Sequence, residues 1–367
     1  MKVEGVFMRV LMIGSNLRVP GGITQVVKNY FQAGIGEKVN ADYFPTYWGG
    51  SNLTNIAYFS FQYLKLFSKL FIKNEKYDVA HVHMSYKGSF TRKKYIIKLL
   101  KLKGIPIILH MHGSQFKEFF RTSSIRQQRK IQDMLNSTDV IIALGEEWRS
   151  YYASISQAEV IALDNAVFPK KIEGVKPEKI YITAMGLLSE RKGTYDLINA
   201  SAGLVNKIDG KYKIVLAGNG EIQKVKRLIE SLGLNDLFIV PGWVSDQATI
   251  ETLYRKSVVY VLPSYNEGMP MSILEAMSYG LPIISTKVGS IPSVVLEGQN
   301  GYLIEPGEQQ EIESKIIHLI HNEEKRALME AANIKKIEDH YNIFGNLNEL
   351  IAIYEKAEKA PAINQDF

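Results

Sequence analysis

The stretch VVYVLPSYNEGMPMSILEAMSYGLPIIST (258–286) predicts a strand, a loop, a helix and a second strand. VVYVLP (258–263) is a short run of β-branched and apolar residues, which is typical of a buried strand. Pro270 suits the first turn of a helix, and Gly280 followed by Pro282 ends it. The helix therefore begins at the carboxyl edge of a parallel sheet, where α/β folds bind ligands.

The same alternation of strands and helices continues on both sides of this stretch. In the second half we expect further strands at 180–186, 212–218, 237–242 and 282–286, with helices from Thr194 and at 221–232, 247–256 and 270–279. In the first half we expect strands at 9–14, 78–84, 105–112 and 139–144, with helices from Ile23 and at 54–73, 86–103 and 123–136. The tail, 308–357, is predicted to be helical throughout. Alternating strands and helices indicate parallel sheets covered on both faces.

The polar segment FPKKIEGVKPE (168–178) has two prolines and no periodicity, which makes it the best candidate for a linker. We therefore predict an α/β protein with two doubly wound, Rossmann-like domains, 1–168 and 179–340, that face each other across a cleft. Residues 341–367 are predicted to form a C-terminal helix that packs back toward the N-terminal domain, with a frayed end at AINQDF (362–367).

The composition narrows the function. The chain has 367 residues, 46% hydrophobic and 22% charged, and no cysteine, which excludes disulfides, thiolate metal sites and cysteine nucleophiles. We expect neither a secretory leader nor a membrane-spanning segment, and we predict a cytoplasmic protein. Residues 1–169 hold 22 Lys/Arg against 12 Asp/Glu (+10), whereas residues 170–367 hold 22 against 26 (−4). The basic half suggests an anionic partner, although chance asymmetry of solvated helix faces would explain the difference equally well.

Two glutamates occupy the ligand edge predicted for the second domain. Glu267 lies in the loop before the 270–279 helix, and Glu275 lies inside that helix. The helix N-terminus offers free N–H groups to a phosphate. A carboxylate beside a phosphate needs a neutral polyol to hold, and a ribose diol is such a partner. Either glutamate alone would more simply be a dipole cap or a surface residue; the pair in this setting indicates a nucleotide site.

Cations follow the strand 180–186 in AMGLLSERKGTYDLINA (184–200). Arg191 and Lys192 lie in the loop before the next helix, where two positive charges would clamp a diphosphate. In the first domain Gly21 and Gly22 open a helix directly after the first strand, so that backbone can approach a ligand closely. Because no GxGxxG motif is present, a dinucleotide cofactor is not indicated.

Histidines cluster in two strands of the first half. In HMHGS (110–114), His112 is predicted to reach the ligand edge, while His110 packs within the strand, as do His81 and His83 in HVHM. These four histidines lack the Asp, Glu or Cys companions of a convincing metal site, so we predict none.

The chain resembles the retaining glycosyltransferases of family 4, which have the GT-B fold. The most specific likeness is Glu267, seven residues, Glu275, within EGMPMSILEAMSYGLPII, followed by KVGSIPSVV and NGYLIEPG. The GG loop, DVAHVHM and HMHG support it. The resemblance covers most of the chain, from the GG loop to GYLIEPGE (301–308).

This resemblance implies a role for each matching residue. It places Glu275 on the donor ribose and Glu267 on the hydroxyls of the donor sugar. His112 would contact that sugar near the reacting carbon, and Lys192 would clamp the diphosphate. The donor-binding loop would also include Gly268, the diphosphate would receive the N–H groups of Met271 and Ser272, and the base would lie against Trp243 and Val244.

The chain departs from the family at Leu187, where the family commonly has arginine immediately after the glycine. This departure puts the arginine half of the clamp in doubt, and Arg191 is a candidate replacement from another backbone position.

The expected activity is transfer of a sugar from a nucleotide sugar, with a UDP-sugar favoured, to a glycan or lipid-linked acceptor. The resemblance implies retention by front-face transfer, without a metal or other cofactor, in the synthesis of a cell-surface polysaccharide or glycolipid. Two alternatives remain open: a nucleotide-sugar epimerase of the same fold, and an inactive GT-B module that only binds. No nucleic-acid partner is expected.

A membrane surface is a further candidate partner. Lys65, Lys69 and Lys73 are spaced four apart in AYFSFQYLKLFSKLFIK (57–73), so they share one helical face opposite aromatics and leucines. TRKKYIIKLLKLK (91–103) adds six cations. Lysines near an anionic leaflet contribute roughly 1 kcal/mol each. The alternative is that both helices pack their apolar faces on the sheet and leave only lysines outside.

Overall fold

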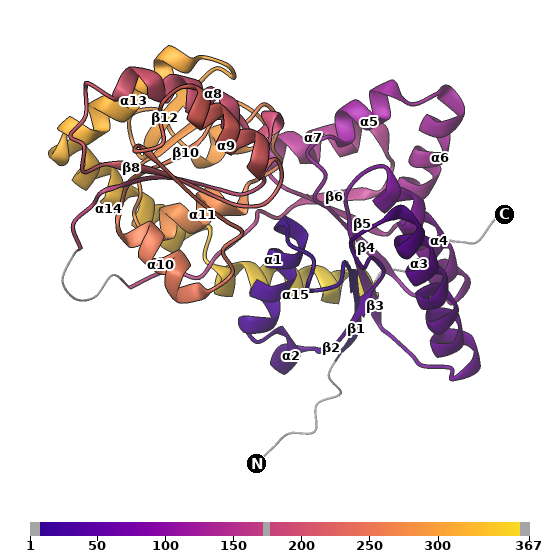
Figure 1. Cartoon of the computed structure of the whole chain (residues 1–367). Coiled ribbons are helices and arrows are strands. Elements are labelled where there is room, and N and C mark those ends of the chain that lie inside the picture. The colour runs from indigo at the N-terminus through magenta and orange to yellow at the C-terminus, as the bar shows by residue number, and fades with distance from the viewer. Residues whose placement is uncertain (1–7, 172–176, 360–367) are drawn as a thin grey trace. The chain divides into compact units, whose positions relative to one another are not determined.

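The structure is a computed structural model that describes residues 8–171 and 177–359 (Figure 1). It divides into two compact units, the N-terminal unit (1–166 with 343–367) and the C-terminal unit (167–342). Residues 172–176 of the predicted linker and the predicted frayed end at 362–367 lie outside the described residues. No helix among the described residues is long and apolar enough to cross a membrane.

The N-terminal unit contains a six-stranded parallel sheet in the order β2-β1-β3-β4-β5-β6. Its strands are β1 (Arg9–Gly14), β2 (Asn40–Pro45), β3 (Val79–Met84), β4 (Ile107–Met111), β5 (Val140–Ala143) and β6 (Glu159–Ala162). Its helices are α1 (Gly22–Gln32), α2 (Ile35–Lys38), α3 (Asn52–Phe67), the π-helical η1 (Ser68–Ile72), α4 (Gly88–Leu102), α5 (Phe116–Thr122), α6 (Ile125–Asn136), α7 (Glu146–Ile155) and α15 (Ile343–Lys359).

The C-terminal unit contains a second six-stranded parallel sheet, in the order β12-β11-β10-β7-β8-β9. Its strands are β7 (Tyr181–Met185), β8 (Lys213–Ala217), β9 (Phe238–Gly242), β10 (Ser257–Leu262), β11 (Ile283–Thr286) and β12 (Gly301–Ile304). Its helices are η2 (Glu190–Lys192), α8 (Thr194–Ser201), η3 (Ala202–Leu204), α9 (Ile222–Ser231), α10 (Gln247–Arg255), α11 (Met271–Ser278), α12 (Ile291–Val294), α13 (Gln309–His321) and α14 (Glu323–His340). The predicted helical tail is therefore three helices, α13 to α15.

The period of two along each strand separates the two faces of the N-terminal sheet. On β3, Ala80 and Val82 point into the apolar core beneath the helices that follow β2 to β5. His81 and His83 alternate with them and point to the other face. That face is covered in part by α15, whose Tyr354 hydroxyl lies 2.6 Å from His81 Nδ1 (Figure 1). The last helix therefore completes the N-terminal unit, although it follows the whole C-terminal unit in sequence.

The helix α3 and its continuation η1 carry an exposed row of large apolar side chains, which we call the apolar strip. It consists of Leu53, Ile56, Phe61, Leu64, Phe67, Phe71 and Ile72, with exposed fractions from 37% to 80%. The alternative to membrane docking, in which this helix packs its apolar face on the sheet and leaves only lysines outside, is therefore wrong for α3 and η1. Only some of the apolar side chains of α3 and η1, including Leu66 and Leu70, are buried in the core of the N-terminal unit.

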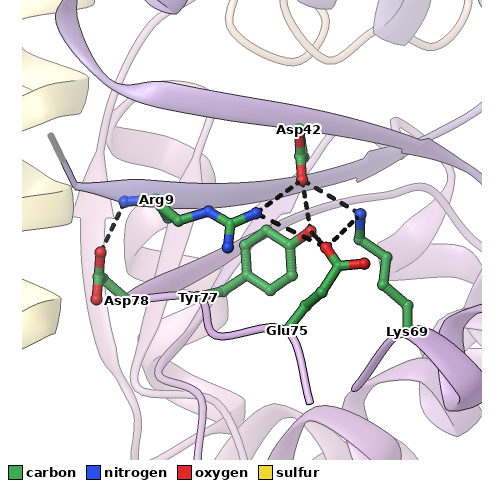
Figure 2. Close-up of polar contacts among 6 residues, drawn as sticks. All are labelled: Arg9, Asp42, Lys69, Glu75, Tyr77 and Asp78. Carbon is green, nitrogen blue, oxygen red and sulfur yellow. Dashed lines mark hydrogen bonds and ion pairs between the residues drawn. The ribbon is translucent and has the colours of Figure 1, made fainter. Parts of the chain in front are cut away.

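Of the three lysines spaced four apart, Lys69 is paired with carboxylates and is only partly exposed. Its ammonium lies 2.8 Å from Glu75 and 3.3 Å from Asp42 (Figure 2). Figure 2 shows Arg9 and Tyr77 completing this cluster, with the Tyr77 hydroxyl 2.5 Å from Asp42. The cluster fixes the end of η1 to β1 and β2, and Lys65 and Lys73 remain exposed.

Candidate functional site

In the C-terminal unit, β10 leads through the loop 263–270 into α11. The strand is fully buried, and Pro270 stands at the N-cap of the helix, where no side chain caps the free N–H groups. Ile273 N–H bonds the Pro270 carbonyl at 3.2 Å, but N–H groups at the start of a helix have no acceptor within it. Met271 and Ser272, as the first two residues of α11, thus supply donors suited to an anion.

The two predicted clamp cations make different contacts. Lys192 Nζ lies 2.5 Å from Glu267 Oε1, and both side chains are largely buried, with exposed fractions of 17% and 7%. Arg191 Nη1 instead donates to the backbone carbonyl of Asn266 at 2.9 Å. Lys192 therefore forms an ion pair with the predicted sugar-binding glutamate, whereas Arg191 supports the loop that carries it.

Two glycines allow this loop to approach its neighbours, and neither was among our predicted site residues. Gly289 has φ +55°, and a Cβ there would lie 2.0 Å from the Glu267 carbonyl oxygen. Gly193 has φ +67°, and a Cβ there would lie 2.0 Å from the Pro263 carbonyl oxygen. Because no larger residue fits either position, the backbone around Glu267 is held between the turns after β7 and β11. In the sequence, only the glycines within ERKG and KVGS could have indicated this close approach.

The loop also contains polar atoms that the described protein leaves without a hydrogen-bond partner. The side-chain oxygens of Ser264 and Asn266 and the hydroxyl of Ser189, which follows β7, are buried and unpaired. The predicted Gly268 is held in the same loop, where its carbonyl accepts from Ser290 N–H at 2.9 Å. Because buried polar groups nearly always have partners, unpaired atoms at the ligand edge of a sheet favour a binding role.

Glu275 lies on α11 and is only partly exposed to solvent. Its Oε2 is 3.5 Å from the hydroxyl of the buried Tyr254, whose ring stacks on Tyr279 with centroids 5.1 Å apart. Burial raises the pKa of Glu275 to about 7, although the Tyr254 hydroxyl and the Lys170 charge oppose the shift. The carboxylate therefore lacks strong partners within the described protein, which suits a residue that holds a ligand hydroxyl.

The loop after β7 borders a small pocket with Gly186, Leu188, Lys192 and Pro263 among its lining residues. Leu187, where the family commonly has arginine, also lines this pocket and is 43% exposed. At the edge strand β9, Gly242 precedes the half-exposed Trp243 and the partly buried Val244. Because β7, β8 and β9 pair in parallel, these residues follow β9 at the same end of the sheet as the loop after β7.

In the N-terminal unit, Gly21 and Gly22 connect β1 to α1. Gly21 is the N-cap residue with φ +149°, and no side chain caps the helix. A Cβ added at either glycine would meet no heavy atom within 4 Å, so the space beside both is open. Close approach of a ligand to this backbone is therefore sterically possible.

His112 directly follows β4 and is half-buried. Its N–H donates to the Met84 carbonyl at 2.8 Å, and its Nε2 is 2.9 Å from His83 Nδ1. Burial lowers the pKa of His112 to about 3, so the ring is neutral at physiological pH. It can therefore give or accept a hydrogen bond as neutral imidazole, but it is not a cationic acid.

The other three histidines of the N-terminal sheet, His81, His83 and His110, lie together on β3 and β4. His81 Nε2 is 3.1 Å from His110 Nδ1, and ligand atoms of His81, His83 and His110 lie within 4.8 Å of one another. They form the one group of three or more potential His, Asp or Glu metal ligands within the described ranges. The ring nitrogens His83 Nε2 and His110 Nε2 are buried without protein partners. The predicted absence of a metal remains a prediction.

Comparison with known proteins finds a family match within the C-terminal unit. Residues 168–336 match the model of "Glycosyl transferases group 1". The chain carries a glycosyl transferases group 1 domain. It is 25% identical over 315 residues to N-acetyl-alpha-D-glucosaminyl L-malate synthase of Bacillus anthracis, covering 81% of this chain and 80% of that protein. It is 27% identical over 307 residues to UDP-Gal:alpha-D-GlcNAc-diphosphoundecaprenol alpha-1,3-galactosyltransferase of Escherichia coli, covering 77% and 76%.

The fold is similar to that of a solved structure. Sucrose-phosphate synthase from Thermosynechococcus elongatus matches with a TM-score of 0.78 at 15% identity, over 95% of this chain and 98% of that one. With two parallel six-stranded sheets flanked by helices, the chain has the predicted GT-B fold, and it is a glycosyltransferase.

Proposed function

We propose that this glycosyltransferase moves a sugar from a UDP-sugar to a glycan or lipid-linked acceptor, with retention at the anomeric carbon, as a member of family 4. The observation that carries the proposal is the Lys192–Glu267 pair beside the uncapped start of α11, with Glu275 further along the same helix. Cations and helix N–H groups suit a diphosphate, and the carboxylates suit hydroxyls. The galactosyltransferase of Escherichia coli, whose name includes UDP-Gal and diphosphoundecaprenol, supports the choice of donor and acceptor class.

The proposed roles follow these contacts. Glu275 accepts from the ribose hydroxyls, and the N–H groups of Met271 and Ser272 with Lys192 bind the diphosphate. Glu267 binds the hydroxyls of the donor sugar, and the neutral imidazole of His112 contacts that sugar near the reacting carbon. Val244 and Trp243 lie against the base, Gly268 shapes the donor loop, and Arg191 supports that loop without replacing the missing family arginine. Gly21 and Gly22 let backbone approach the substrates.

We propose front-face transfer for the chemical step. The bond between the anomeric carbon and the diphosphate oxygen breaks, and the acceptor hydroxyl attacks from the same face. The acceptor proton passes to the leaving diphosphate, so the products are the glycoside and UDP. The protein then has to stabilise developing diphosphate charge and position both substrates. The Lys192 cation and the α11 N–H groups would do this without a divalent ion.

A panel of nucleotide sugars tests the activity and its metal requirement together. We expect release of UDP from one UDP-sugar, by transfer or slow hydrolysis, at the same rate with EDTA as with magnesium. Chromatography of the nucleotide products distinguishes this result from epimerisation, which would yield an isomeric UDP-sugar and no UDP. Loss of turnover in EDTA that magnesium, manganese or zinc restores would reject the metal-free mechanism. Binding without turnover across the panel would indicate an inactive module.

We also propose that the chain works in the cytoplasm at the inner face of the cell membrane, docked through the apolar strip of α3 and η1. Leu53 is 80% exposed, Leu64 67% and Ile72 72%, far more apolar area than a single solvent-facing residue presents. Exposed Lys65 lies on α3, and exposed Lys73 directly follows η1. An apolar face flanked by lysines is typical of a helix that lies in a membrane interface. Synthesis of cell-surface polysaccharide or glycolipid would require this location for a lipid-linked acceptor.

Vesicle co-sedimentation tests the apolar strip. We expect the protein to sediment with vesicles that contain phosphatidylglycerol at low salt. Phe61→Ser with Leu64→Ser should weaken binding by at least tenfold, because each buried apolar side chain contributes roughly 1.5–3 kcal/mol. The matched control is Leu328→Ser, an equally exposed leucine in the C-terminal unit. Protein that stays in the supernatant at low salt, or equal binding of both variants, would contradict docking through the strip.

A further inference from the structure

Three cations of the N-terminal unit each contact one residue of the segment 46–48, which follows β2. Arg18 follows β1, and Arg92 and Lys93 lie in the first turns of α4. In the described ranges none of the three has a carboxylate within ion-pair distance. Other partly buried cations, such as Lys69 and Lys192, do have one. Uncompensated positive charge at the ligand edge of a sheet needs an explanation.

Lys93 is the most buried of the three, with an exposed fraction of 3%. Its Nζ donates to Thr46 Oγ1 at 2.5 Å, and the Thr46 hydroxyl in turn donates to the Gly14 carbonyl at 3.0 Å. Burial and the nearby Arg92 charge both lower the pKa of Lys93. A lysine ammonium has three donors, and the described protein satisfies one of them. A buried ammonium in this state would be stabilised by an anion.

Arg92 and Arg18 lie against the aromatic residues that follow β2. The Arg92 guanidinium is 4.6 Å from the centroid of Tyr47, and that of Arg18 is 4.3 Å from Trp48. Arg92 Nε is buried and has no hydrogen-bond partner in the described protein. The loop that carries Arg18 is tied to the same place, because Asn16 N–H donates to the Tyr47 carbonyl at 2.7 Å.

We infer that Arg18, Arg92 and Lys93 form a binding site for the phosphate or diphosphate group of a phosphorylated sugar acceptor. The assignment to the acceptor rests on the proposed function; the anion site itself does not. Guanidinium groups bind phosphate through paired N–H donors, and Arg92 has an unused one. The aromatic side chains hold both guanidinium planes by cation–π contact and leave Trp48, which is 39% exposed, as an apolar surface beside the anion.

The proposed anion site and the proposed donor diphosphate site are built from residues of different units. The donor groups, Lys192 and the start of α11, belong to the C-terminal unit, whereas the three cations belong to the N-terminal unit. A bound acceptor diphosphate would compensate these positive charges, which explains why no carboxylate of the described protein pairs with them. The acceptor's neutral analogue, with the same sugar but no phosphate, would lose those contacts and leave the cations uncompensated.

Calorimetry with inorganic pyrophosphate tests the site without requiring turnover. The titration uses the full chain with Lys192→Met, which weakens the donor site, so that the remaining heat reports the N-terminal site. We expect binding to persist in that background and to weaken at least tenfold with Arg92→Gln, Lys93→Met or Arg18→Gln. The matched control is Lys98→Met, an exposed lysine on the same helix, which should leave pyrophosphate affinity unchanged. Arg18 is exposed, so its variant should fold normally even where Lys93→Met alters stability.

Two results would overturn the inference. One is absence of pyrophosphate binding in the Lys192→Met background, or equal affinity in the Arg92→Gln, Arg18→Gln and Lys98→Met chains. The other is full displacement of that pyrophosphate by UDP, which would assign the anion to the donor and not to the acceptor. If pyrophosphate binds as expected while the nucleotide-sugar panel gives no product, the anion site stands and the proposed transferase activity fails.

Discussion

Lys192→Met is expected to lower kcat by about 10²–10³-fold, whereas Arg191→Met should lower it by less than tenfold. Removal of one fixed donor to developing anionic charge costs about this much in other enzymes. Lys192 Nζ lies 2.5 Å from Glu267 in the site, while the Arg191 guanidinium is already bonded to the Asn266 carbonyl. The measurement is steady-state release of UDP from the donor that the panel identifies, with kcat and KM determined separately.

A loss of stability must be separated from a loss of chemistry in the Lys192 variant. Removing one member of a buried ion pair leaves the other charge uncompensated, which typically costs 3–5 kcal/mol of folding free energy. Lys192→Met combined with Glu267→Gln removes both charges, so the double variant should regain thermal stability without regaining turnover. The assignment of Lys192 to the diphosphate fails if Lys192→Met and Arg191→Met lower kcat equally, or if the double variant Lys192→Met with Glu267→Gln recovers activity.

The sequence predicted the central strands well because they are buried on both faces. Strands such as β3 and β10 have continuous apolar runs that stand out from their surroundings. We did not expect β2, β6 or β12, and each of them is an edge strand. β2 and β6 are the two edges of the N-terminal sheet, and β12 is one edge of the C-terminal sheet. β2 reads NADYFP and β6 reads EVIA, with mostly half-buried residues. An edge strand needs less apolar surface, so its pattern is weaker.

The sequence predicted which residues belong to the candidate site, but it did not predict which atoms their side chains contact. Glu267 and Lys192 were selected in loops that follow strands, and Glu275 in the helix that follows such a loop. The structure brings Lys192 and Glu267 into contact. That Arg191 bonds a backbone carbonyl could not be read from the adjacent letters R and K, because the difference depends on where each side chain points. The glycines Gly193 and Gly289 were visible in the sequence, but the carbonyls they approach were not.

Side-chain exposure was the least predictable feature. A helix such as α3 has apolar residues on most of its circumference, and periodicity alone does not tell which of them face the sheet. The apolar strip therefore appears only in the structure. Likewise, the sequence shows Arg92 and Lys93 within a basic helix but does not show that Lys93 is buried beside Thr46 without a carboxylate.

Donor affinity is expected to fall as the pH drops below about 7. Burial raises the pKa of Glu275 to about 7, and the proposed ribose contact requires the carboxylate as acceptor. If only the ionised form holds the ribose, affinity weakens by up to tenfold per pH unit below that value. Glu275→Gln should bind the donor roughly 10- to 100-fold more weakly at pH 8, since a hydrogen bond to a charged group contributes about 1.5–3 kcal/mol. Its affinity should then be nearly independent of pH.

Glu275→Gln is expected to change the folding stability of the free protein in the opposite direction to its donor affinity, which makes the test specific. A carboxyl group whose pKa is raised by folding stabilises the free protein below its unfolded pKa, near 4.5, and that contribution is lost as the pH rises through about 7. The free protein should therefore gain stability at pH 8 from Glu275→Gln while it loses donor affinity.

Calorimetry from pH 5.5 to 8.5 should use the UDP-sugar, because the terminal phosphate of UDP itself titrates near pH 6. His81 and His112, whose pKa values burial lowers to about 3, do not titrate in this window. Glu230→Gln, at an exposed carboxylate on α9, is the matched control and should retain the wild-type pH dependence. A wild-type affinity that stays constant from pH 8 to 5.5, or a Glu275→Gln chain that binds the donor as well as the wild type, would remove Glu275 from the ribose.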